Sequence, residues 1–166
     1  MNKYSKAILT GLGGALVMFI FIALGTFASD FAPYNVPPSK AFLMQLGLGA
    51  QPVPIIVHFL YGALGSVVVV AFFGTKINWR HGMSFALLMW LIMMLVYSPI
   101  IGWGVFGLQP EVGLSEELML GSGTKYILST LVLHVLYGLA IGFGNEYWIN
   151  ERNVNTDTPH TAFVSE

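Results

Sequence analysis

The chain has 166 residues, of which 55% are hydrophobic and only 9% are charged, and its formal net charge is −1. An ordinary soluble domain carries roughly 25% charged residues, so this composition excludes one and is typical of a multi-pass membrane protein. The charge gives no basis for nucleic-acid binding, and the absence of cysteine excludes disulfides, thiolate metal sites and cysteine nucleophiles.

Four long uncharged runs predict four transmembrane helices, because each is long enough to cross a hydrocarbon core of roughly 30 Å. We place these spans at about residues 7–28, 53–74, 83–101 and 126–144, inside one all-α domain of residues 1–149. Residues 150–166 are then a polar cytoplasmic tail. A signal peptide is the competing interpretation of the first run, but that run exceeds the usual apolar region of about 7–15 residues.

The connecting segments carry proline and glycine. Pro38 predicts the start of a short interfacial helix, and Pro99 is expected to kink or end the third span. The segment that follows, with Gly102, Trp103 and Gly104, predicts irregular backbone at membrane depth, which must be covered by protein or water. We expect it to contact a partner or to cover a ligand site.

Basic residues predict the orientation. Only Lys40 and Lys125 lie on one face, whereas the other face holds both termini and most cations: Lys3, Lys6, Lys76, Arg80 and Arg152. Both termini are therefore expected in the cytoplasm. Trp79 and Trp148 fit an inner aromatic belt, and Trp103 and Tyr126 fit an outer one.

A repeat organises the spans. His58-Phe-Leu-Tyr61-Gly62 in span two matches His134-Val-Leu-Tyr137-Gly138 in span four, and residues 15–24 align with residues 86–95. The chain thus resolves into a duplicated helical hairpin with pseudo-two-fold symmetry about the membrane normal. Gly11 and Gly14 share one face of span one and permit close helix approach.

The two histidines are the candidate binding residues. In a helix each histidine shares a face with the tyrosine and glycine of its motif, and a histidine in a span normally points into the protein. One hypothesis is a b-type haem held by His58 and His134. A second is that each ring bonds to the neighbouring hairpin or a partner subunit, with Tyr61 and Tyr137 in the network. A third is a quinone or lipid headgroup at this face, and the absence of any cofactor stays equally open.

Several absences narrow the function. No Asp, Glu, Lys or Arg lies within the four predicted spans, which disfavours proton pumps and ion-coupled transporters. The sequence has no serine–histidine–acid set, phosphate-binding loop or dinucleotide motif, and no cluster of metal ligands. We therefore expect a protein without catalysis of its own.

The segment Gly102-Trp-Gly-Val-Phe-Gly107 and the terminal motif Leu133-His-Val-Leu-Tyr-Gly138 carry a resemblance. With the glycine-rich first span and the tryptophan, methionines and proline of span three, the chain resembles a family of small four-helix membrane proteins of unknown function, found in bacteria and haloarchaea. The family implies the fold and a location in the cytoplasmic (inner) membrane of a bacterial or archaeal cell, and it implies no catalytic residue.

The expected function is that of a non-catalytic accessory subunit, surrounded by membrane lipid and packed against a larger complex such as a respiratory or other metal-containing oxidoreductase. Glycine faces would allow close packing, and the outer segments would meet the partner. The alternatives are a bis-histidine haem b electron carrier and a quinone- or lipid-binding membrane protein.

Overall fold

The computed structural model describes residues 1–27 and 32–150. Within them, four helices are long and apolar enough to cross a membrane, so the protein is an all-α, multi-pass membrane protein as predicted. These are α1 (Lys3–Phe27), α3 (Val53–Phe73), α6 (Gly123–Ile149), and α4 (Trp79–Ile92) with its continuation through the π-helical turn η2 (Met93–Tyr97) and α5 (Ser98–Ile100). Most of the predicted tail, residues 151–166, lies outside the described residues.

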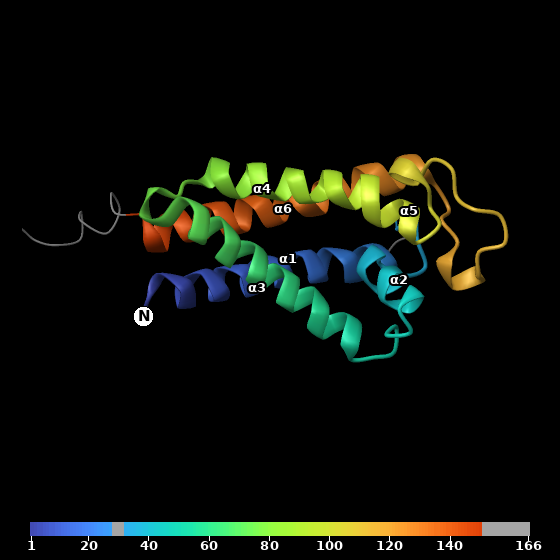
Figure 1. The fold of residues 1–166 in the computed structure, drawn as a ribbon, viewed down its shortest axis with the longest axis horizontal. Coiled ribbons are helices and arrows are strands. Elements are labelled where there is room, and N and C mark those ends of the chain that lie inside the picture. Colours follow the sequence, from blue (N-terminus) through green and yellow to red (C-terminus); the bar gives the residue numbers. More distant parts are fainter. Residues whose placement is uncertain (28–31, 151–166) are drawn as a thin grey trace, which may run out of the picture.

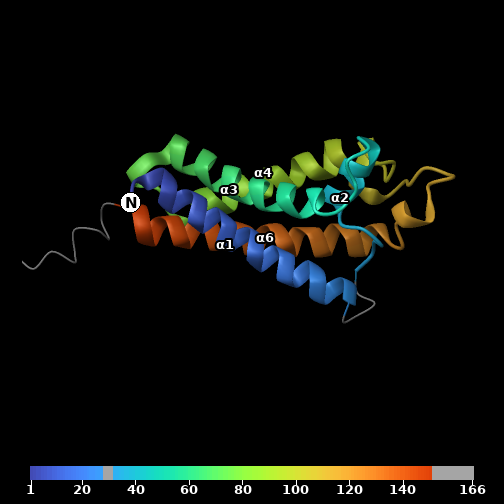
Figure 2. The same ribbon diagram turned by 90° about the horizontal axis from the view of Figure 1, so that it is seen from below.

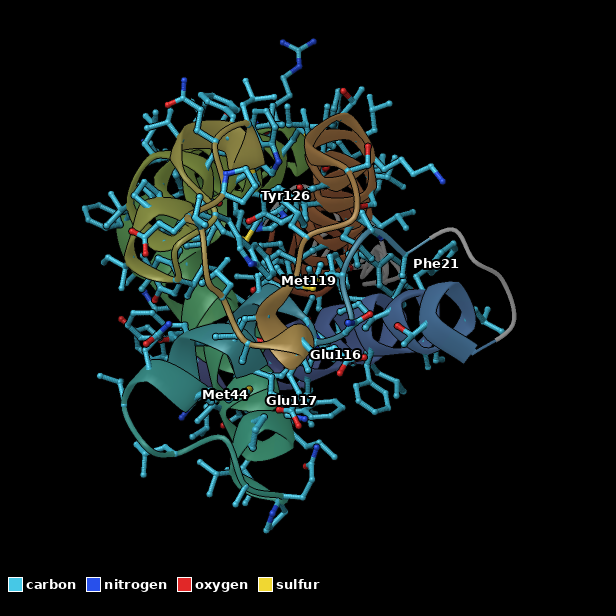
Figure 3. The ribbon with its side chains drawn as sticks, turned by 90° about the vertical axis from the view of Figure 1, so that its right-hand side faces the viewer. Phe21, Met44, Glu116, Glu117, Met119 and Tyr126 are labelled. Atoms are coloured by element: carbon cyan, nitrogen blue, oxygen red, sulfur yellow. The ribbon has the colours of Figure 1, made fainter. Side chains whose placement is uncertain are left out.

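The remaining elements are short. Helix α2 (Pro38–Gln45) begins at the predicted proline, and three 3₁₀ turns, η1 (Gly74–Lys76), η3 (Val105–Gly107) and η4 (Glu116–Leu118), lie in the connections. Helix α2, η3 and η4 all lie at one end of the bundle, which we call the distal end (Figures 1 and 3). Lys3 and Ile149 end their helices at the opposite end, because an even number of spans returns the chain to its starting side.

The helices form an open bundle. Helix α1 packs along both α3 and α6, and α4 packs along α6 (Figures 1 and 2). Helices α3 and α4 are linked by η1, have few contacts with each other, and diverge from that turn towards the distal end (Figure 1). This divergence sets the position of the candidate site.

The two hairpins pack through equivalent glycines. In the first, a Cβ atom on Gly62 would lie 2.8 Å from the carbonyl oxygen of Gly11 and would also meet Ala15. In the second, a Cβ atom on Gly138 would lie 3.2 Å from the carbonyl oxygen of Gly82 and 2.9 Å from the Cβ of Ala86. Both crossings therefore bring backbones together at small residues, as expected for a duplicated hairpin.

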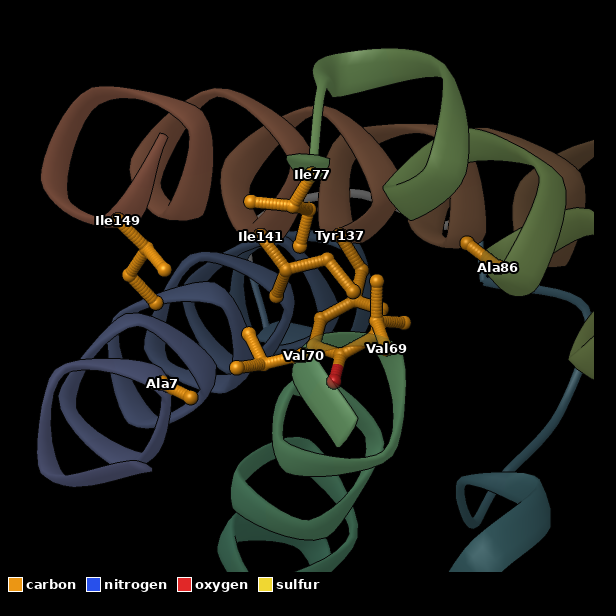
Figure 4. Close-up of a cluster of buried hydrophobic side chains, with 8 residues drawn as sticks. All are labelled: Ala7, Val69, Val70, Ile77, Ala86, Tyr137, Ile141 and Ile149. Atoms are coloured by element: carbon orange, nitrogen blue, oxygen red, sulfur yellow. The ribbon is translucent and has the colours of Figure 1, made fainter. Parts of the chain in front are cut away.

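One core lies where all four helices converge, near η1. Val69 and Val70 of α3 meet Ile141 of α6 and Ile77, with Ala7 of α1 beside them (Figure 4). Polar groups beside this core are tied across helices: Asn145 Nδ2 donates to Ser66 Oγ at 2.8 Å, and Asn150 Nδ2 donates to the carbonyl of Ile77. The first bond joins α6 to α3, and the second holds the connection between the hairpins against the end of α6.

A second core fills the distal end and corrects one prediction. Trp103 and Tyr126 were expected in an outer aromatic belt, but both are fully buried. The Trp103 ring stacks on Tyr34, its Nε1 donates to the carbonyl of Leu118 at 2.7 Å, and the Tyr126 hydroxyl bonds Ser98 Oγ at 2.7 Å. Figure 3 shows Tyr126 and the loop that carries Glu116 and Glu117 together at this end of the bundle. The polar groups of both rings are hydrogen-bonded within the chain, so the rings do not have to lie in the headgroup layer of the membrane.

The glycines on either side of Trp103 adopt backbone conformations that the turn at this position requires. Gly102 and Gly104 have φ angles of 84° and 70°, a region that L-residues rarely adopt. Gly104 also lies directly against the backbone of Gln109. Pro99 is in the first turn of α5 and the helix ends at Ile100, in agreement with the prediction. The π-helical turn η2 interrupts the regular α-helix just before this proline.

Candidate functional site

A cavity of about 510 Å³ lies where α3 and α4 diverge. Residues of α1 and α6 form its floor, and Pro37, Pro38 and Ser39 close it at the distal end. At its rim, Tyr61 and Leu64 of α3 are 49% and 57% exposed, so the cavity opens between the two helices on the face that meets the membrane.

The cavity brings the predicted site residues together. His58 and Tyr61 line it from α3, and His134 and Tyr137 line it from α6, with Gly62 beside them. Gly11 and Gly14 lie behind it at helix contacts: Gly14 faces the Tyr137 ring, and Gly11 faces Gly62. The distal residues Pro99, Gly102, Trp103 and Gly104 do not line this cavity.

Hydrogen bonds fix the tautomer of each histidine. His58 Nε2 lies 2.9 Å from the carbonyl oxygen of Ala15, and His134 Nδ1 lies 2.8 Å from that of Thr130. A carbonyl oxygen can only accept, so both of these ring nitrogens carry the proton and donate. A neutral imidazole then has a bare lone pair on its other nitrogen, which is Nδ1 in His58 and Nε2 in His134. Among the described residues neither of these nitrogens has a hydrogen-bond partner.

These partners correct the expectation that each histidine bonds to the neighbouring hairpin. Ala15 belongs to the same hairpin as His58, and Thr130 lies one turn before His134 on the same helix. Both carbonyls lie within reach of the rings because α1 packs along α3 and because Thr130 precedes His134 by one helical turn.

The two motif tyrosines have different hydrogen-bond partners. Tyr137 is buried, and its hydroxyl donates to the Gly62 carbonyl at 2.6 Å across the packed centre of the bundle. The equivalent bond for Tyr61 would run to the carbonyl of Gly138 on α6. Its hydroxyl instead lies 3.1 Å from that of Tyr97, at the rim of the cavity. The site thus combines one buried tyrosine with an exposed pair of hydroxyls.

The rest of the lining is apolar. Phe85, Met89, Met93 and Tyr97 follow one another every four residues along α4 and η2 and form one wall. None of the described residues that line the cavity is an Asp, Glu, Lys or Arg. A mostly apolar cavity with a few fixed polar groups is typical of a small-molecule site.

The geometry bears on the haem hypothesis in two ways. Both histidines face one cavity, as bis-histidine ligation requires, but His58 Nε2 is already bonded to Ala15. The lining described above also has no cation to pair with haem propionates. Haem ligation stays a prediction from the sequence. Among the described residues, no group of three or more His, Cys, Asp or Glu side chains could hold a metal ion.

Some lining residues escaped the sequence analysis. The four-residue spacing of Phe85, Met89, Met93 and Tyr97 is visible in the sequence, but it equally fits a stripe packed on a neighbouring helix. The contribution of Pro37 to Ser39 has no sequence signal, because it depends on where the connector folds back.

Comparisons of the chain with protein-family models, with curated proteins and with solved structures gave no match. The proposed function therefore rests on the fold and the cavity.

Proposed function

We propose that this protein binds a lipid-soluble molecule with a small neutral headgroup inside the cavity between α3 and α4. The observation that carries the proposal is that His58 and His134, from different hairpins, both line one apolar cavity and that each has a ring nitrogen without a partner among the described residues. A polar nitrogen in an apolar site is stabilised when a ligand supplies its hydrogen bond.

The lining defines the ligand class. Without a charged side chain, the cavity would leave an ionic headgroup uncompensated in a medium of low polarity. Apolar side chains such as Leu64, Val68 and Met89 suit a hydrocarbon tail or a flat ring. The exposed rim lets such a molecule pass between bilayer and cavity without crossing water. An isoprenoid quinone or quinol meets these requirements.

We test the proposal by filling the cavity. Leu64 lines the cavity, whereas Leu60, one turn away on α3, is similarly exposed and does not line it. Protein purified in mild detergent is extracted with organic solvent, and the lipids are measured by mass spectrometry. We expect a neutral lipid enriched over the bulk membrane in the wild type and in Leu60→Trp, but not in Leu64→Trp.

An equal lipid profile in all three proteins, matching the bulk membrane, would overturn the proposal. The circular dichroism spectrum and the elution volume of each variant show whether the tryptophan has disturbed the fold rather than the cavity.

We retain a second proposal, that the chain is an accessory subunit of a larger membrane complex. Its support is the sparse packing of α3, which runs along α1 only and leaves large apolar side chains exposed, Ile56 and Leu60 among them. Helices of a partner would add contacts on this face that lipid does not supply. Binding and assembly are compatible, because a partner could receive the bound molecule.

A further inference from the structure

We infer that the cavity selects a headgroup that donates hydrogen bonds, and that its ligand is the dihydroxy, reduced form of a quinone-type lipid rather than the quinone. The inference rests on the proposed function, because it concerns the same cavity. Its basis is the pair of tautomers fixed by Ala15 and Thr130.

The chemistry of the two free nitrogens decides the preference. With the protons of His58 and His134 engaged by carbonyl oxygens, the nitrogens left for a ligand can only accept. A quinone headgroup presents carbonyl oxygens, which also only accept, so it leaves both nitrogens unsatisfied. A quinol presents two hydroxyl groups, which donate, and the cavity has an acceptor for each.

Neither way of reversing this preference is favourable. Shifting a proton to the other ring nitrogen would break the 2.9 Å bond of His58 to Ala15 or the 2.8 Å bond of His134 to Thr130. Protonating a ring would place a positive charge among lining residues that include no Asp or Glu. The hydroxyls of Tyr61 and Tyr97 can both donate and accept, so they do not discriminate between the two forms.

A simple alcohol on an apolar tail shares the donor chemistry but has one hydroxyl, so it satisfies one of the two histidines. The cavity should therefore rank a quinol above an isoprenoid alcohol, and both above a quinone.

The test compares three probes: decylubiquinol, decylubiquinone and farnesol. Nanodiscs that contain the full chain, and empty nanodiscs as the partition control, are incubated with each probe under argon, and the retained probe is measured by chromatography. We expect decylubiquinol to be retained about tenfold more strongly than decylubiquinone after subtraction of the control, since each added neutral hydrogen bond contributes about 0.5–1.5 kcal/mol and about 1.4 kcal/mol is tenfold.

Variants locate the effect. His134→Phe removes one acceptor and should lower the quinol-to-quinone ratio several-fold. Leu60→Phe changes a side chain of α3 that does not line the cavity and should keep the wild-type ratio. If His134→Phe does not fold, the quinol-to-quinone ratio of the wild type still tests the inference without the variants.

The outcomes separate the inference from the proposed function. Equal or stronger retention of the quinone would overturn the donor preference and leave ligand binding intact. Farnesol retained as strongly as the quinol would overturn the dihydroxy headgroup. Retention of all three probes at the level of empty nanodiscs would overturn the proposed function as well.

Discussion

Tyr61 and Tyr137 occupy the same place in the repeated motif and have different surroundings. Tyr137 is 7% exposed and bonded to a backbone carbonyl of another helix, whereas Tyr61 is 49% exposed and meets only another hydroxyl. The motif itself cannot distinguish them, because the difference comes from the helix that each side chain faces. Sequence reasoning identified the residues and could not assign their roles.

The histidines show the same limit. Their helical position predicted that both point into the protein, and both do line the cavity. Their hydrogen-bond partners, the carbonyls of Ala15 and Thr130, are backbone atoms, which carry no sequence signal. The tautomer, on which the ligand preference depends, was therefore beyond prediction.

At the distal end, burial raises the pKa of Tyr34 from 10.0 to about 12. A hydroxyl whose pKa is higher in the folded protein favours folding fully below pH 10 and loses that contribution as the pH rises towards 12. We expect the melting temperature, followed by tryptophan fluorescence, to fall between about pH 9 and about pH 11.5. Tyr34→Phe keeps the stacked ring and removes the ionisable group, so its melting temperature should fall less. The same alkaline loss in both proteins would contradict the assignment to Tyr34.

At the scale of the elements, the two helices of each hairpin pack against each other in the same way in both hairpins. Gly11 and Ala15 meet Gly62 in the first, and Gly82 and Ala86 meet Gly138 in the second. The sequence alignment paired Ala15 with Ala86 and Gly62 with Gly138, and the structure adds the equivalence of Gly11 and Gly82. The alignment also predicted a symmetric bundle, but α1 packs along α6 whereas α3 and α4 diverge.

These crossings can be tested with one substitution at three glycines. A Cβ atom on Gly11 would lie 2.8 Å from Ala63 Cα, and one on Gly82 would lie 2.6 Å from Gly142 Cα, whereas one on Gly13 would meet nothing within 4 Å. We expect Gly11→Ala and Gly82→Ala to lower the free energy of unfolding by about 1–3 kcal/mol. Gly13→Ala should leave it unchanged or raise it by up to about 1 kcal/mol, since alanine favours the helix.

Denaturant titration in detergent micelles measures all three. Equal effects at Gly11, Gly13 and Gly82 would show that helix propensity, rather than the close crossings, sets the response.

Some helix boundaries were predicted from the sequence, and others were not. Helix α2 begins at Pro38 and the third span ends just after Pro99, as their proline chemistry indicated. Helix α4, however, begins at Trp79 rather than near Met83, because Asn78 caps it by accepting from Arg80 N at 3.0 Å. A count of uncharged residues locates the part of a helix that crosses the bilayer. It does not detect that the helix continues through a turn with charged residues.

At the scale of the whole molecule, the accessory-subunit proposal makes its own prediction. A Cβ atom on Gly138 would already lie 3.0 Å from Met83 Cα, so Gly138→Leu should separate α4 from α6 and weaken any assembly that depends on the bundle. We expect the tagged wild type to co-purify in gentle detergent with subunits of a larger complex, and Gly138→Leu to lose them. Gly13→Ala is the control that should retain them.

Mass spectrometry identifies the co-purified chains, and a reduced-minus-oxidised visible spectrum of the same material tests the haem hypothesis. A wild type that migrates alone, or a complex unchanged in Gly138→Leu, would count against the accessory role.

The divergence of α3 from α4 has a consequence for how affinity must be measured. Because the exposed rim faces the membrane, the ligand that we propose would reach the cavity by lateral diffusion in the bilayer, and the solvent that dilutes it would be lipid. Doubling the lipid at constant protein and ligand should lower the occupancy, whereas doubling the buffer volume should leave it nearly unchanged. The dissociation constant of this site is therefore a mole fraction in the membrane and has no fixed value in moles per litre of water.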